Sequence, residues 1–219
     1  MVKLGNLLIL GDSYSTFEGY IPDSFEAYYS ESAASETGVD GVEQTWWMRL
    51  IRATESRLLL NSSWSGTTIC NTGYCGDCSG SSFITRFDQL AEGGFFRENP
   101  VDTILIFGGT NDSWADAPIG ELQYSGWRKE DLYCFLPAVC YLIHRVKTVL
   151  PRVRVICIIN TEMKDAIAGG IKTACEKLGA EAVALQEIEK QSGHPNRTGM
   201  AQICGQILQY LDGGKNSPA

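Results

Sequence analysis

The sequence predicts an α/β fold with a mostly parallel sheet and helices on both faces of that sheet. Short apolar runs, which are typical of buried parallel strands, alternate along the chain with stretches whose apolar residues recur at helical spacing. Such alternation is typical of parallel strands joined by right-handed crossovers. The chain has 219 residues, of which 44% are hydrophobic and 20% are charged. This composition is sufficient for one sizeable core.

Strands and helices are expected to alternate within a single domain over residues 1–212, followed by a disordered tail at 213–219. The expected strands lie near residues 6–10, 57–61, 101–107, 153–159 and 181–185. The expected helices lie near residues 44–55, 83–91, 131–150, 163–178 and 197–212.

These expected elements are predicted from the patterns of apolar residues and from the residues at the ends of each element. The run Leu-Leu-Ile-Leu at 7–10 is continuous, as in a strand that is buried on both faces. The helix expected at 131–150 and the last helix instead carry apolar residues at helical spacing. Asn196 precedes the last helix and is a suitable N-cap for it.

The motif Gly11-Asp12-Ser13 directly follows the first apolar run. A glycine lets the backbone turn sharply there, so the Ser13 hydroxyl is expected at the carboxyl edge of the sheet, where open α/β folds bind ligands. A serine in this place can act as a nucleophile if a base activates it and donors receive the oxyanion. It can equally be an ordinary cap or turn residue, so this motif does not decide the function alone.

Three further motifs follow in order along the chain. They are Asn61-Ser62-Ser63-Trp64-Ser65-Gly66, Gly108-Gly109-Thr110-Asn111-Asp112 and Gly193-His194-Pro195-Asn196. The first two each follow a strand-like run, at 57–60 and 101–107. Together with the first motif, they resemble the sequence blocks of the SGNH (GDSL-type) hydrolase family. The resemblance extends from about residue 5 to about residue 205, which is almost the whole chain.

The resemblance implies a flavodoxin-like, three-layer α/β/α fold around a mostly parallel five-stranded sheet. It also implies four catalytic residues, which are Ser13, Gly66, Asn111 and His194. In the expected chemistry, Ser13 attacks an acyl carbonyl, while His194 takes its proton and later passes it to the leaving alcohol. The backbone N–H groups of Ser13 and Gly66 and the side-chain amide of Asn111 are expected to bind the oxyanion.

One position departs from the family pattern. The family usually has an aspartate three residues before the histidine, and Gln191 stands there in this chain. A glutamine oxygen can orient an imidazole but cannot offset its positive charge, so Glu187, Glu189 and a backbone carbonyl remain alternatives. We therefore expect a Ser-His dyad whose orienting group the sequence leaves open. The other histidine of the chain, His144, is expected to be a partly exposed helix residue without a catalytic role.

Three long segments, at 14–43, 67–82 and 110–130, are expected to follow strand carboxyl ends and to build the substrate pocket. Aromatic residues in these segments, and one beside Gly66, can stack on sugar rings or line an acyl pocket, or they can simply pack the loops. They are Tyr20, Tyr28, Tyr29, Trp64, Tyr74, Trp114, Tyr124 and Trp127.

The chain contains eight cysteines. Five lie in helix or strand patterns and are expected to be small buried hydrophobic residues. These are Cys134, Cys140, Cys157, Cys175 and Cys204. Cys70, Cys75 and Cys78 share a glycine-rich segment, but they lack the second pair of ligands typical of a zinc site. A chance arrangement or a local disulfide is the better interpretation, and no metal or cofactor is expected.

The overall charge and hydropathy exclude several classes of protein. A net charge of −8 argues against nucleic-acid binding. No apolar run is long enough for a membrane span, and no leader peptide is visible, so a cytoplasmic location is expected. No phosphate-binding glycine pattern follows a strand, which disfavours a nucleotide binder. The oligomeric state is not predicted.

The sequence thus predicts a serine-dependent hydrolase of small acyl esters, with O-acetylated carbohydrate as one possible substrate. A lysophospholipase- or thioesterase-type lipid acylhydrolase is an alternative. A ligand-binding module that has lost turnover through the change at Gln191 is another.

Overall fold

A computed structural model describes residues 3–32 and 34–213. Its central sheet has five parallel strands in the order β2-β1-β5-β6-β7. The strands are β1 (Asn6–Gly11), β2 (Arg57–Ser63), β5 (Thr103–Phe107), β6 (Arg154–Ile159) and β7 (Glu181–Ala184). The predicted α/β fold and its flavodoxin-like strand order are thereby confirmed.

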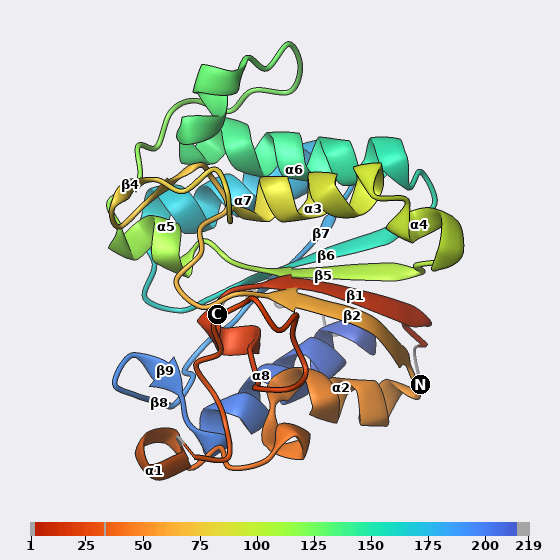
Figure 1. Cartoon of the computed structure of the whole chain (residues 1–219), viewed down its shortest axis with the longest axis vertical. Coiled ribbons are helices and arrows are strands. Elements are labelled where there is room, and N and C mark those ends of the chain that lie inside the picture. The colour runs from red at the N-terminus through yellow and green to blue at the C-terminus, as the bar shows by residue number, and fades with distance from the viewer. Residues whose placement is uncertain (1–2, 33, 214–219) are drawn as a thin grey trace.

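Helices cover both faces of this sheet (Figure 1). The helices on one face are α3 (Phe83–Glu92), α6 (Phe135–Val149) and α7 (Asp165–Leu178). Those on the other face are α2 (Trp46–Thr54) and α8 (Arg197–Leu211). Each face has its own hydrophobic core, because successive side chains of a strand point to opposite sides. In β1, for example, Leu8 and Leu10 enter one core while Leu7 and Ile9 enter the other.

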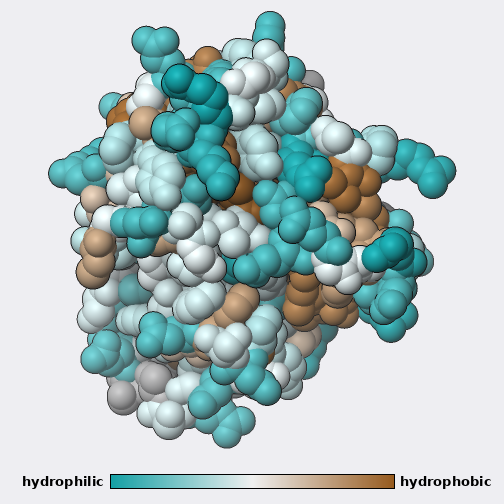
Figure 2. Space-filling model, turned by 45° about the horizontal axis from the view of Figure 1, so that its top comes forward, coloured by the Kyte–Doolittle hydropathy of each residue, from teal (hydrophilic) through white to brown (hydrophobic). Residues whose placement is uncertain are grey.

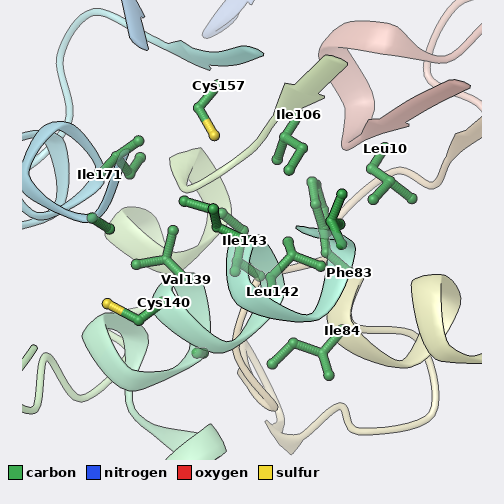
Figure 3. Packing of buried hydrophobic residues seen from close by; sticks show 14 of the residues in the cluster. Leu10, Phe83, Ile84, Ile106, Val139, Cys140, Leu142, Ile143, Cys157 and Ile171 are labelled. Atoms are coloured by element: carbon green, nitrogen blue, oxygen red, sulfur yellow. The ribbon is translucent and has the colours of Figure 1, made fainter. Parts of the chain in front are cut away.

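The core beneath α6 is shown in Figure 3. Ile106 of β5 and Cys157 of β6 lie opposite Val139, Leu142 and Ile143 of α6. All five side chains are at most 2% exposed. On the face turned to the viewer in Figure 2, hydrophilic side chains predominate and apolar ones gather in small areas. In the described part of the chain, no helix is both long and apolar enough to cross a membrane.

The remaining elements are short and lie in the connections. The short α-helices are α1 (Ala34–Thr37), α4 (Phe95–Glu98) and α5 (Thr110–Trp114). The 3-10 helices are η1 (Ser13–Ser15), η2 (Val42–Gln44) and η3 (Lys129–Tyr133). Two small antiparallel hairpins pair β3 (Thr72–Gly73) with β4 (Gly76–Asp77) and β8 (Lys190–Gln191) with β9 (His194–Pro195). Figure 1 places α5 and both hairpins on the same side of the molecule.

The helix expected at 131–150 begins later than the sequence predicted. Cys134 is extended, with φ −106° and ψ 141°, and it separates η3 from α6. The cause is Pro137, which has no N–H and whose ring would clash with the carbonyl group of Tyr133 in a continuous helix. Pro137 is tolerated at its position because it lies in the first turn of α6. The expected disordered tail falls on residues of which 214–219 lie outside the described part of the chain.

The start of α8 is a tightly packed point of the fold. The side chain of Asn196 caps the helix by accepting a hydrogen bond from the Gly199 N–H at 2.8 Å, as the sequence predicted. Gly199 is buried, and a Cβ added to it would overlap the backbone carbonyl oxygen of Glu189. This glycine therefore lets α8 approach the segment that leads into β8. Gly205, in the same helix, is exposed and has open space around it.

We expect Gly199→Ala to lower the free energy of unfolding by about 1–3 kcal/mol, since overpacking forces the backbone to shift. Gly205→Ala is the matched control, and we expect it to raise that free energy by about 0.5–1 kcal/mol through the better helix propensity of alanine. Urea denaturation of both variants measures the difference. Equal stabilities of the two variants would contradict the close approach at Gly199.

Candidate active site

The nucleophile candidate Ser13 lies immediately beyond the end of β1. Gly11 ends the strand in a confined space, because an added Cβ would overlap the side chains of Ser15 and Ser63. Asp12 then caps η1 by accepting a hydrogen bond from the Tyr14 N–H at 3.1 Å. Ser13 is the first residue of η1 and is buried. The glycine and the cap together turn the chain so that the Ser13 hydroxyl lies at the carboxyl edge of the sheet.

The imidazole of His194 lies against this hydroxyl. Its Nε2 atom is 3.0 Å from the Oγ atom of Ser13. Its Nδ1 atom is 3.1 Å from the carbonyl oxygen of Ser192. Because a carbonyl oxygen can only accept a hydrogen bond, Nδ1 carries the ring proton and Nε2 is free to accept the proton of Ser13. The pair has the geometry of a nucleophile and its general base.

The backbone around His194 is fixed by two buried tyrosines. The hydroxyl of Tyr14 donates to the carbonyl oxygen of Gly193 at 2.5 Å. The hydroxyl of Tyr29 donates to the carbonyl oxygen of Pro195 at 2.8 Å. Both tyrosine side chains are 1% exposed. The residues on either side of His194 are thus tied to the segment that follows β1.

The turn between β8 and β9 supplies the group that orients the imidazole. Ser192 and Gly193 have φ angles of +52° and +77°, and two positive φ angles are typical of a type I′ hairpin turn. This turn presents the Ser192 carbonyl oxygen to His194 Nδ1. Of the alternatives that the sequence left open, the structure therefore has the backbone carbonyl in this place.

The three side chains that were alternatives for this role lie elsewhere. Gln191 is exposed, and its side chain makes no hydrogen bond to any residue that the structure describes. Glu187 and Glu189 are also exposed. The Oε2 atom of Glu189 accepts a hydrogen bond from the Asn196 side chain at 3.4 Å. No carboxylate is hydrogen-bonded to the His194 ring within the described residues.

Two of the three oxyanion donors expected from the sequence come from the connections after β2 and β5. Asn111, in α5, donates from Nδ2 to the Thr67 carbonyl oxygen at 2.9 Å and accepts at Oδ1 from the Tyr74 hydroxyl at 2.9 Å. These two bonds fix which way the amide points and leave one Nδ2 proton for a ligand. Gly66 has a φ angle of +76° with open space where a Cβ would lie, and no described residue accepts a hydrogen bond from its N–H. Its N–H can therefore approach a ligand.

A buried arginine that sequence reasoning missed supports this region. Arg86 is 2% exposed, and its guanidinium donates to the carbonyl oxygens of Gly11, at 3.1 Å, and of Ser62. It also donates to the Thr67 hydroxyl at 3.1 Å. It thereby links the ends of β1 and β2 to the turn that contains Gly66. A charged residue between the apolar positions 83, 84 and 87 of a predicted helix was the signal that could have identified it.

Two carboxyl groups are buried beneath the site. Asp112 accepts the N–H groups of Ile69 and Cys70 at 2.9 and 3.0 Å, which fixes the start of the segment 67–82. Burial raises the pKa of Asp112 to about 6. Burial raises the pKa of Asp12 to about 7, and repulsion from Asp112 adds to this while Arg86 opposes it. Burial also lowers the pKa of Arg86 to about 9.

The pKa of His194 is lowered, first by burial, while the acceptor carbonyl of Ser192 acts in the opposite direction. The imidazole is therefore neutral at neutral pH, as a general base must be. The positive charge of Lys190 also lowers this pKa, and the carboxylate of Glu36 raises it.

The aromatic residues expected near the substrate pocket divide into two groups. Tyr28, Tyr29 and Trp114 contact the His194 ring, and Tyr74 contacts Asn111. Trp64, which precedes Gly66, stacks on Phe25 with ring centroids 4.4 Å apart.

For Tyr124 and Trp127, the structure shows the second of the interpretations that the sequence left open, because both rings pack their loop against helices. Tyr124 lies under the Lys177 ammonium group of α7. Trp127 packs on Tyr141 and His144 of α6, because the segment 115–130 folds back over that helix. Tyr20 packs on Phe17 and Trp47. His144 is exposed on α6, as predicted.

The cysteines are all free thiols. Cys140, Cys157, Cys175 and Cys204 are buried, whereas Cys134 is half-buried at the break before α6. Cys75 is exposed at the tip of the β3–β4 hairpin, and Cys78 lies 3.0 Å from the Thr68 hydroxyl. Among the described residues, no group of three or more histidine, cysteine or acidic side chains is placed to hold a metal ion.

The model of the GDSL-like lipase/acylhydrolase family matches residues 5–211. The chain belongs to this family. A protein from Bacteroides ovatus that is described as a GDSL-like lipase is 42% identical in sequence to this chain. Its crystal structure matches this one with a TM-score of 0.89, over 97% of this chain and 100% of that one. A protein of the same description from Bacteroides uniformis is also 42% identical, with a TM-score of 0.88 over 95% and 96% of the two chains.

More distant structures share the fold of this GDSL-like protein. A carbohydrate esterase family 2 enzyme with a carbohydrate-binding domain, from Corynascus thermopiles, is 17% identical, with a TM-score of 0.67 over 98% of this chain and 67% of that one. A comparison with curated protein sequences gives no match.

We expect Gln191→Asp and Gln191→Ala to change kcat/KM by no more than about twofold, the effect typical of an exposed side chain. The reason is that residue 191 points to solvent while the Ser192 carbonyl occupies Nδ1. Steady-state hydrolysis of an acetyl ester measures both variants. A tenfold rise in kcat/KM for Gln191→Asp would contradict this arrangement, because it would mean that the new carboxylate stabilises the positive charge on His194.

The raised pKa values of Asp12 and Asp112 make stability depend on pH. Both values exceed the 3.8 of an ordinary aspartate, so the folded state keeps protons that the unfolded state releases. The resulting stabilisation is present below about pH 4 and is lost as the pH rises through about 7. Its size is about 1.4 kcal/mol for each unit of pKa difference.

We therefore expect the free energy of unfolding to fall between about pH 4 and pH 7. Asp12→Asn retains a cap oxygen but cannot ionise, so it should flatten that fall. Urea denaturation across the pH range measures the slope in both proteins. If Asp12→Asn kept the slope of the wild type, Asp12 would not be the titrating group.

Proposed function

We propose that this protein is a serine-dependent carboxylic ester hydrolase that removes short acyl groups, with O-acetylated carbohydrate as its substrate class. Membership of the GDSL-like lipase/acylhydrolase family supports hydrolysis of esters. The observation that carries the proposal is the 3.0 Å contact between Ser13 Oγ and His194 Nε2, with Nδ1 held by a carbonyl oxygen. This arrangement matches the demands of nucleophilic acyl transfer.

In the proposed reaction, Ser13 Oγ attacks the acyl carbonyl carbon while its proton passes to His194 Nε2. The oxyanion of the tetrahedral intermediate accepts hydrogen bonds from the N–H groups of Ser13 and Gly66 and from Asn111 Nδ2. Collapse of this intermediate breaks the ester bond, and His194 returns its proton to the leaving alcohol. Water, activated by His194 in the same way, then releases the acyl group as a carboxylic acid.

The distribution of aromatic residues favours a carbohydrate as the alcohol part of the ester. Tyr74 is 54% exposed and bonds to Asn111, while Trp114 is 43% exposed and lies against Gly193 and His194. Two exposed rings thus flank the candidate dyad, one on the oxyanion side and one on the histidine side. Exposed aromatic faces can stack on sugar rings. The shared fold with a carbohydrate esterase is in keeping with this substrate class.

The assembled contacts also favour turnover over the alternative of a binding module without activity. The change at Gln191 removes a carboxylate, but the Ser192 carbonyl still selects the tautomer in which Nε2 is the base. A protein that only binds a ligand would have no need for this hydrogen-bonded orientation.

We expect Ser13→Ala to abolish hydrolysis of small acetyl esters while the fold remains intact. Asn111→Ala should lower kcat by about 10²–10³-fold, the usual effect of losing one oxyanion donor. A fluorophosphonate probe, followed by peptide mass spectrometry, should label wild type at Ser13. Ser65→Ala, in the turn next to Gly66, is the matched control and should keep both activity and labelling. Labelling at Ser15 or Ser65, or wild-type turnover by Ser13→Ala, would refute the assignment.

The substrate class is tested separately, with a series of esters of increasing acyl length and with acetylated xylan. The proposal requires acetyl groups to be released with the highest kcat/KM and the acetylated polysaccharide to be hydrolysed. A preference for long acyl chains would instead assign the protein to the lipid acylhydrolases, with the same nucleophile.

A further inference from the structure

Four aromatic rings surround the imidazole of His194. Tyr28 is parallel to it, with ring centroids 3.5 Å apart and an interplanar angle of 9°. Tyr14 is tilted at 5.4 Å, and Tyr29 and Trp114 present edge-to-face contacts at 6.5 and 6.2 Å. Only Tyr28 among these four therefore lays its π face directly on the imidazole ring.

The stack is tied to the nucleophile through the backbone. The N–H of Tyr28 donates to the Thr16 hydroxyl at 2.9 Å. The same hydroxyl donates to the Ser13 carbonyl oxygen at 2.9 Å. The Tyr28 ring also meets the Tyr29 ring edge-on at 4.9 Å, and the Tyr29 hydroxyl holds the carbonyl group of Pro195. Tyr28 is thus linked to Ser13 through the Thr16 hydroxyl, and its ring contacts His194 directly.

The two groups that are hydrogen-bonded to the His194 ring carry no negative charge. Nδ1 meets the neutral carbonyl of Ser192, and Nε2 meets the hydroxyl of Ser13. Lys190, whose ammonium group binds Thr161 and Glu162, repels a cation on the ring, and Glu36 attracts one. When His194 takes the proton of Ser13, a positive charge forms on a half-buried imidazole.

We propose that the π face of Tyr28 provides the charge stabilisation that a carboxylate provides in a Ser-His-Asp triad, while the Ser192 carbonyl provides the orientation. The face of an aromatic ring is negative, and a cation within about 6 Å of the ring centroid is attracted to it, more strongly where water is excluded. Tyr28 acts through His194 and is a positioning residue. Burial raises the pKa of its own phenol, so Tyr28 acts as a neutral ring. The kinetic part of this inference rests on the proposed function, whereas the titration below does not.

Two roles of Tyr28 predict different shifts in the pKa of His194. If Tyr28 only covers the imidazole, removing it admits water, and the lowered pKa of His194 rises toward its ordinary value. If the π face stabilises the cation, replacing the ring by an aliphatic side chain lowers that pKa further. The sign of the shift therefore separates the two roles.

The test is a proton–carbon NMR titration of the histidine ring in the free protein. The chain has two histidines, so a His144→Gln variant assigns the signals. Tyr28→Phe keeps the π face and should leave the pKa of His194 unchanged. Tyr28→Leu keeps an apolar side chain at this position without a π face and should lower it by about half a unit. Tyr20→Leu, which alters a ring of the same segment that packs on Phe17 and Trp47, should cause no shift.

Kinetics on an acetyl ester supply the second readout. We expect Tyr28→Leu to lower kcat by about 3- to 30-fold with little change in KM, and Tyr28→Phe to retain wild-type kcat. An unchanged or raised pKa of His194 in Tyr28→Leu would overturn the proposal. If that variant does not fold, pentafluorophenylalanine at position 28 keeps the ring and reverses the charge of its face. The pKa of His194 should then fall, and an unchanged value would overturn the proposal equally.

Discussion

Two tyrosine hydroxyls connect the beginning of the chain to its end and thereby hold the proposed catalytic pair, Ser13 and His194, together. Tyr14 and Tyr29 follow β1, and they hold the carbonyl groups on either side of His194, some 180 residues later in the sequence. The β8–β9 hairpin is only two residues long on each strand, and so short a hairpin is not stable by itself. Its position depends on these bonds and on the close approach of α8 at Gly199. The 3.0 Å contact between Ser13 and His194 therefore depends on packing on the α2–α8 side of the sheet.

The oxyanion side depends on a different group of buried residues. Arg86 brings a positive charge into the interior beneath the turns that carry Gly66 and Asn111, together with the carboxyl groups of Asp12 and Asp112, whose pKa values burial raises. Such groups are costly to bury, and in this site each one ties backbone groups of the connections in place. The free energy of unfolding is therefore lower than with an uncharged interior, and in return the backbone donors are held where the proposed oxyanion would form.

Much of the fold and the positions of the expected site residues could be predicted from the sequence. The continuous apolar runs identified the buried strands, and the motifs that follow strand ends placed Ser13, Gly66 and Asn111 on one edge of the sheet. The late start of α6 could also have been predicted, because Pro137 is tolerated only in the first turn of a helix. The role of the Ser192 carbonyl could not, because it arises from the φ angles of a turn. The sequence also could not predict that Tyr28 contacts His194 whereas Trp127 packs on α6. Both residues lie in loops, which have no periodicity from which side-chain contacts can be predicted.

An orienting group made of backbone is subject to different evolutionary rules from a side chain. Every residue has a carbonyl oxygen, so the hydrogen bond from His194 Nδ1 requires of residue 192 only that it tolerates a positive φ angle. What matters is that two residues, and no other number, separate the paired positions Gln191 and His194. We therefore expect this arrangement to tolerate substitutions at residue 191 but not insertions or deletions in the turn. The length of this turn, which sequence motifs seldom record, is then the feature that keeps the His194 imidazole oriented.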